Sequence, residues 1–336
     1  MSTGQTSWRK ALAAGMAVLA GICLSTSAWG AEIRNVTAKQ RYPWNGLVDI
    51  RCTASGIEDG VSWLLVAEAV EPDSGAVHEL SHFWVVRDGT NSTDRAVRAD
   101  GEYELLWDAQ ADLGEVVCSN MVVQVAFDER PMARLWEGGP YWADRNVGAE
   151  EPWEYGYHFW WGDAVGYTWE NDQWVASDGS SSGFSFVGTN VPTVKMSNSK
   201  LLNEGWITSD NVLAPEHDPA QAQWGRGWRM PTGQELSDLR EKCDRTWVTT
   251  NGVKGVLICG RDEYASASIF IPAAGWGNKA TWDRAGLYGY LLARDPLTDG
   301  TARSWRIIFR EGQFTLDQYY DRFLGSSCRP VQGGAE

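Results

Sequence analysis

Short runs that alternate apolar and polar residues fill the chain from Glu32 to about Asp128. The clearest runs lie at residues 47–52, 61–66, 77–86, 103–107 and 121–127. A period of two turns one face of a strand to a core and the other to solvent. The number of these runs and the turn residues between them predict an antiparallel β-sandwich over residues 32–128.

The texture of the chain changes after this region. Residues 129–140, which include Pro131 and end in Gly138-Gly139-Pro140, are typical of a linker. Residues 141–332 are rich in aromatic residues and glycine, and we expect short strands, long loops and one clear helix there. Thr232 and Glu235 have the spacing of a capping box, so this helix should begin just after Thr232.

The first thirty residues are typical of a secretory signal peptide. Arg9 and Lys10 precede an apolar run over 11–24, and the small residues Ala28 and Gly30 follow at positions −3 and −1 of a cleavage site. The run is shorter than the ~18–20 residues that a spanning helix needs. We therefore expect a secreted, extracellular or cell-surface protein without a transmembrane anchor in its mature chain.

Composition narrows the classes of function. The 336 residues include 29 Lys and Arg but 44 Asp and Glu, a net charge of −15, which argues against binding to nucleic acid or to anionic membranes. The 43% of hydrophobic residues is enough for a packed core. Twenty tryptophans and 36 glycines suit short strands and many loops better than helix bundles.

Three stretches of the second half carry a family resemblance. They cover 141–163, 224–255 and 269–275, with a terminal Cys328-Arg329-Pro330-Val331. Together they resemble the Fibrobacter succinogenes major paralogous domain, which is related to the formylglycine-generating (sulfatase-modifying factor) type of C-type-lectin-like fold. The resemblance spans nearly all of 141–332. It implies an α+β domain in an exported or surface-associated bacterial protein, and the first domain resembles immunoglobulin-like sandwiches by pattern.

The cysteines indicate disulfides rather than a metal site. Cleavage after Gly30 leaves an odd number of them, namely Cys52, Cys118, Cys243, Cys259 and Cys328. In an exported protein we expect a Cys52–Cys118 bridge between the two sheets. Our first choice for a second bridge joins Cys243 to Cys328. No CxxC motif and no paired Cys/His spacing occurs, so we predict neither a metal nor a cofactor.

The sequence does not favour a catalytic interpretation. His78-Glu79-Leu80-Ser81-His82 matches the HExxH zinc-protease motif, but its context predicts a strand, in which the two histidines lie roughly 13 Å apart. A formylglycine-generating activity needs a reactive cysteine pair, and none of the cysteines stands in a recognisable catalytic motif. We predict no catalytic residues.

Aromatic residues are the candidate binding groups. Tyr155, Tyr157, Phe159 and Trp161 alternate and are expected to form a buried face. Five tryptophans in polar loop settings are the better candidates for exposure and for stacking on a sugar or peptide; they are Trp153, Trp169, Trp174, Trp276 and Trp282.

The sequence thus favours a non-catalytic exported protein that carries a module for binding a glycan or a surface protein. The alternatives are an enzyme of the sulfatase-modifying type that acts on protein substrates, and a purely structural envelope protein.

Overall fold

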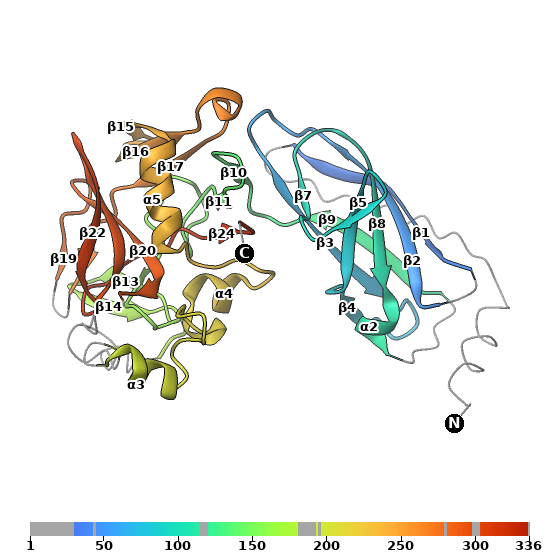
Figure 1. Cartoon of the computed structure of the whole chain (residues 1–336), viewed down its shortest axis with the longest axis horizontal. Coiled ribbons are helices and arrows are strands. Elements are labelled where there is room, and N and C mark those ends of the chain that lie inside the picture. Colours follow the sequence, from blue (N-terminus) through green and yellow to red (C-terminus); the bar gives the residue numbers. More distant parts are fainter. Residues whose placement is uncertain are drawn as a thin grey trace. The chain divides into compact units, whose positions relative to one another are not determined.

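A computed structural model gives the fold of the chain. It describes residues 30–42, 45–114, 120–180, 193, 196–278, 281–297 and 303–334, without the side chains of 317–321. The predicted signal peptide therefore lies almost wholly outside the described residues. The fold is mainly β, as predicted, with several sheets (Figure 1). The chain divides into two compact units, Met1–Pro131 and Met132–Glu336.

Within its described residues, the first unit has two antiparallel sheets. One has the order β1 (Glu32–Gln40), β2 (Leu47–Ser55), β8 (Gly101–Asp108), β5 (Phe83–Arg87) and β6 (Thr90–Ser92). In the other, β3 (Trp63–Val70) pairs with β4 (Val77–Glu79), β7 (Ala96–Val97) and β9 (Val122–Phe127). The short helix α2 (Ala109–Leu113) follows β8.

Alternation along the strands explains how these two sheets share one core. In β9 the burial pattern alternates strictly, with Val123 and Val125 buried. A single cluster joins Ile50 and Phe83 of the first sheet to Leu65 and Val125 of the second. The predicted strands are present, although the run over 77–86 is broken into β4 and β5.

The boundary between the units differs from the predicted linker of 129–140. Residues 132–140 belong to the second unit, because β10 (Met132–Arg134) pairs with β11 (Tyr141–Ala143) and the connection between them is largely buried, apart from Glu137 and Gly138. Leu135 is 0% exposed and Trp136 only 6%. The glycines that indicated a linker form the turn of a hairpin instead, and the Trp136 ring lies where a side chain on Gly139 would be.

The described residues of the second unit form five small antiparallel sheets. Their strand orders are β10–β11–β24 (Val331–Gln332); β14 (Gln173–Ala176)–β13 (Tyr167–Glu170)–β12 (His158–Phe159)–β23 (Ser326–Ser327); β15 (Asp244–Thr250)–β16 (Val253–Cys259)–β17 (Ser268–Pro272); β18 (Trp276–Gly277)–β19 (Trp282–Asp283); and β20 (Gly289–Pro296)–β21 (Arg303–Arg310)–β22 (Gln313–Asp321). The helices are α3 (Asn198–Asn203), η5 (Pro215–His217), α4 (Pro219–Trp224), α5 (Gly233–Lys242) and η6 (Asp262–Tyr264).

Helix α5 forms as predicted. Thr232 accepts the Glu235 backbone N–H, and the Glu235 side chain accepts the Thr232 N–H, which is a complete capping box. Leu236, Leu239 and Cys243 lie on one buried face. That face packs against β20–β22 (Figure 1) in a core shared with β16 and β17.

The last strand of the second unit closes on its first hairpin. Strand β24 pairs with β11, and Trp142 faces Val331 in this register. Just before β24, the buried Arg329 donates to the Ala143 and Phe270 carbonyl oxygens and to the Asn146 side chain, each at 2.9 Å. One arginine from the end of the chain therefore holds three separate segments of the unit together.

Candidate functional site

A cluster of rings surrounds the imidazole of His158. We call this the aromatic cluster, and its members are Tyr155, His158, Trp160, Tyr167, Trp169, Trp174 and Trp282. Their centroids lie 5.1–5.9 Å apart, mostly in edge-to-face arrangements. Such geometry adds about 0.5–1.5 kcal/mol per pair beyond the burial of area. The cluster is therefore a rigid element made of strands β12–β14 and the hairpin β18–β19.

The segment Ala273-Ala274-Gly275 supports the hairpin. The Ala274 carbonyl oxygen accepts the Trp282 Nε1–H at 2.7 Å and lies 3.2 Å from His158 Nε2. Gly275 has φ +71°, and a Cβ there would stand 2.2 Å from the Asp283 carbonyl oxygen. Only glycine fits both the left-handed conformation and this close approach of two backbones. The small residues noted in the sequence thus set where Trp276 and Trp282 lie.

The five predicted binding tryptophans differ in exposure and in position. Trp174 is only 4% exposed and donates its Nε1–H to the Asn278 carbonyl oxygen, so its predicted exposure is wrong. The other four are half-buried; they are Trp153, Trp169, Trp276 and Trp282. Trp169, Trp174 and Trp282 meet in the aromatic cluster, whereas Trp276 lies on the opposite face of the β18–β19 hairpin.

The predicted buried face is only partly present. Phe159 and Trp161 are buried, but Tyr155 and Tyr157 are half-buried. Strand β12 has two residues, so alternation does not extend along this segment. Sequence reasoning did not connect Tyr155 with His158 and Trp282, because the contacts join residues far apart in the chain.

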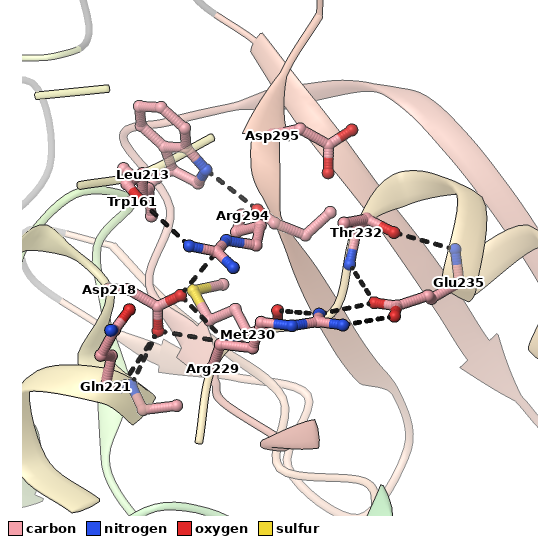
Figure 2. Close-up of polar contacts among 12 residues, drawn as sticks. Trp161, Leu213, Asp218, Gln221, Arg229, Met230, Thr232, Glu235, Arg294 and Asp295 are labelled. Carbon is pink, nitrogen blue, oxygen red and sulfur yellow. Dashed lines mark hydrogen bonds and ion pairs between the residues drawn. The ribbon is translucent and has the colours of Figure 1, made fainter. Parts of the chain in front are cut away.

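A buried carboxylate caps the N-terminus of helix α4 (Figure 2). Asp218 is 0% exposed and accepts the backbone N–H groups of Ala220, Gln221 and Met230. Arg294 Nε lies 3.6 Å from Asp218 Oδ2. Burial raises the pKa of Asp218, and the Arg294 charge and these hydrogen bonds oppose that rise. The carboxylate thus ties α4 to the segment that precedes α5.

Two further acids act at the start of α5 (Figure 2). Glu235 pairs with Arg229 through both oxygens, at 2.6 and 2.8 Å. Asp295 Oδ1 accepts the Gly233 N–H at 2.7 Å, and burial raises the pKa of Asp295 to about 6. Each acid satisfies a backbone donor that the first turn of a helix leaves unpaired. These contacts stabilise the start of α5.

Asp163 contacts the aromatic cluster, and its carboxylate should make the stability of the fold depend on pH. Its carboxylate accepts the Tyr167 O–H at 2.9 Å and the Val165 N–H at 3.0 Å, and burial raises its pKa to about 6. The folded protein holds the proton of Asp163 more tightly than the unfolded chain, whose pKa is 3.8. The stability that this proton contributes is complete below pH 3.8 and is lost as the pH rises through about 6. Between pH 4 and pH 8, the free energy of unfolding of Asp163→Asn should therefore rise by up to about 3 kcal/mol relative to that of wild type.

Urea unfolding at several pH values measures this difference. The exposed Asp172→Asn is the control and should follow wild type at each pH. Two other buried groups also titrate in this range: Asp295, whose pKa is raised, and His158, whose pKa is lowered to about 4 by burial. They are unchanged in the variant and cancel from the difference. A constant difference across pH would contradict the buried titration of Asp163.

Three of the four described cysteines are buried, and Cys259 is half-buried. Cys52, Cys243, Cys259 and Cys328 are free in the structure. Burial raises the pKa of Cys52 and Cys243 to about 12 and that of Cys328 well above its usual value. Cys243 and Cys328 belong to different core clusters, so the predicted bridge between them is not formed. Cys118, the predicted partner of Cys52, lies outside the described residues.

The HExxH motif is not helical, as its context predicted. His78 lies in β4 and contacts Glu71 at 3.0 Å, while His82 follows β4 and contacts Asp112 at 2.7 Å. Each histidine thus has its own carboxylate partner. Among the described residues, no group of three or more His, Cys, Asp or Glu side chains has the arrangement of a metal site.

Within the described part of the chain the longest helix is α5, with ten residues, and none combines the length and the hydropathy of a membrane span. Comparison with known proteins identifies no relative: no family model, no curated protein and no solved structure matches this chain. The functional argument therefore rests on the residues described above.

Proposed function

We propose that this chain is an exported, non-catalytic binding protein and that its second unit binds a glycan. The observation that supports this most directly is the aromatic cluster. Trp160, Tyr167 and Trp174 form its buried floor, while Trp169 and Trp282 remain half-exposed above them. Rigid rings that are already ordered lose little conformational entropy when a sugar stacks on them.

The proposal keeps the fold assignment made from the sequence. We propose that the first unit is an immunoglobulin-like sandwich, which the shared core of its two antiparallel sheets supports. We propose that the second unit is a C-type-lectin-like domain of the major paralogous type. Its small sheets, the helix α5 with its capping box and the pairing of β24 with β11 support this. In such an arrangement a scaffold of strands would present loops for binding.

The thiols favour binding over the alternative of a sulfatase-modifying enzyme. Such an enzyme needs an activated cysteine, and a nucleophilic cysteine has a lowered pKa. Burial raises the pKa of all four described cysteines. The alternative of a purely structural envelope protein would leave the half-exposed rings without a ligand, and the experiment below tests this.

A glycan array probed with the full chain, followed by titration of the best glycan, tests the proposal. Trp169→Ala should weaken binding by about 1–3 kcal/mol, the usual loss for an aromatic anchor. The domain should stay folded, because Trp169 is half-buried near the end of a hairpin. Trp282→Phe, which keeps a ring in the cluster, should weaken binding less.

Trp247→Ala is the matched control, because Trp247 is also half-buried but lies in β15, outside the aromatic cluster. It should bind like wild type. Absence of binding to every glycan, or equal losses in the Trp169 and Trp247 variants, would overturn the proposal.

A further inference from the structure

The sheet β20–β22 (Figure 1) has one face packed against α5 and a second face with different residues. Leu291, Ile307 and Leu316 lie opposite one another in the register and point into the core shared with α5. The residues that alternate with these three along each strand lie on the opposite face of the sheet. On that face Tyr290 and Thr315 flank Ile308, and Gln313 is paired with Arg310.

Two arginines enclose one tyrosine on this face. The Arg284 guanidinium carbon lies 4.7 Å from the centroid of the Tyr288 ring, and that of Arg310 lies 5.2 Å from it. Tyr288 stacks on Tyr290 with the ring planes at 13°, and Arg284 also covers Trp276 at 5.2 Å. We call these residues the arginine–tyrosine surface. One ligand can contact both guanidinium groups, because they lie around the same ring.

The charge of these two arginines is not balanced by an acid. Elsewhere arginines have carboxylate partners, such as Arg41 with Asp49 and Arg261 with Asp244. Within the described part of the chain, neither Arg284 nor Arg310 has a carboxylate oxygen within 4.0 Å, although the chain has 44 acidic residues. Both side chains are exposed. The rings contact both guanidinium groups, and Arg310 also donates from Nε to Gln313 Oε1 at 2.7 Å and from Nη1 to the Tyr288 hydroxyl. The Arg310 Nη2 group and the Arg284 guanidinium are the donors that remain for a ligand.

The backbone of Arg284 supports a role for its side chain. Its φ is +62°, in the left-handed region that disfavours side chains with a Cβ. Glycine would occupy this position in the turn before β20 at a lower conformational cost. Backbone strain of this kind is typical of residues whose side chains have a function. Leu287 in the same turn is 58% exposed, so the turn also presents apolar surface.

We propose that the arginine–tyrosine surface binds the carboxylates of an acidic polysaccharide. The planar guanidinium matches a carboxylate with two parallel hydrogen bonds. The amide of Gln313 donates to the hydroxyl of Thr315 at 3.3 Å on the same face, and the remaining N–H of Gln313 and O–H of Thr315 are suited to sugar hydroxyls. Two exposed guanidinium groups without an ion pair among the described residues favour an anion. This inference names the ligand class of the proposed glycan-binding function and rests on it.

The test uses the full chain and measures binding to polygalacturonate, hyaluronan and heparin. Fully methyl-esterified polygalacturonate, which has the same backbone without charge, is the neutral probe. At least one acidic polymer should bind, and the double variant Arg284→Gln/Arg310→Gln should weaken this binding tenfold or more. Added salt should weaken wild-type binding as well.

Two controls separate binding from folding and from net charge. Arg240→Gln/Lys242→Gln removes two exposed positive charges from α5 and should bind within twofold of wild type. Arg284→Gly should lose binding while its Tm stays unchanged or rises, because glycine relaxes the turn. A lower Tm in Arg284→Gly would mean that this arginine serves the fold and would overturn the inference.

The outcomes distinguish this inference from the function on which it rests. If the neutral probe or another neutral glycan binds in a Trp169-dependent way and the arginine variants bind like wild type, the inference is wrong and the proposed function stands. If no glycan binds, both fail. Arginine-dependent binding to poly-glutamate or single-stranded DNA, without binding to any acidic polysaccharide, would assign the surface to a different class of ligand and overturn the inference.

Discussion

Asp218→Ala is expected to lower the free energy of unfolding of the second unit by about 3–5 kcal/mol. The substitution leaves three backbone N–H groups without their acceptor and Arg294 without its nearby charge. Breaking a buried pair from one side costs far more than breaking an exposed pair. Since whole domains are stable by only 5–15 kcal/mol, this loss is a large fraction of the total. Urea unfolding followed by hydrogen exchange, which reports the two units separately, measures it.

The exposed pair of Asp244 and Arg261 supplies the control. The Asp244 side chain is 69% exposed, so Asp244→Ala should cost less than 1 kcal/mol. Hydrogen exchange in the first unit should be the same in both variants. Equal effects of the two substitutions on the second unit would contradict the role given to Asp218.

Gly275→Ala is expected to destabilise the second unit by about 2–4 kcal/mol. The new Cβ would combine the cost of a left-handed conformation with a contact of 2.2 Å to the Asp283 carbonyl oxygen. The backbone oxygen can move only if the β18–β19 hairpin moves, so the positions of Trp276 and Trp282 should change as well. Near-ultraviolet circular dichroism would report the altered packing of the rings.

Gly312→Ala separates the two costs. Gly312 also has a left-handed conformation, φ +73°, but an added Cβ would meet no atom within 4 Å. It should therefore cost only about 1 kcal/mol, the conformational part alone. A loss in Gly275→Ala no larger than this would show that the hairpin yields easily.

Local signals in the sequence predicted the elements whose causes are local. The capping box at Thr232 and the alternation in β9 depend on residues within a few positions of each other, and the structure contains both. The turn signals before Tyr141 were also local and real. They were assigned to a linker because the contact that buries Trp136, with Trp142 of the next strand, is tertiary.

The candidate site was less predictable for the same reason. Trp174 stands among polar residues, yet Trp160 and His158 bury it from another strand. Arg284 and Arg310 have no sequence motif, and only the pairing of β20 with β21 brings them to one tyrosine. One available signal was overlooked. Asp218 before Pro219 is a good helix start, which predicts α4 and its capping carboxylate.

The pairing of β24 with β11 has a consequence for the order in which the protein acquires its structure during synthesis. The first unit has its complete core once residues up to Phe127 are available. The second unit needs Arg329 and Val331 to join segments that were translated much earlier. The first unit can therefore fold before the rest of the chain arrives, whereas the second must wait for Val331 and Gln332 and exposes its aromatic segments until then.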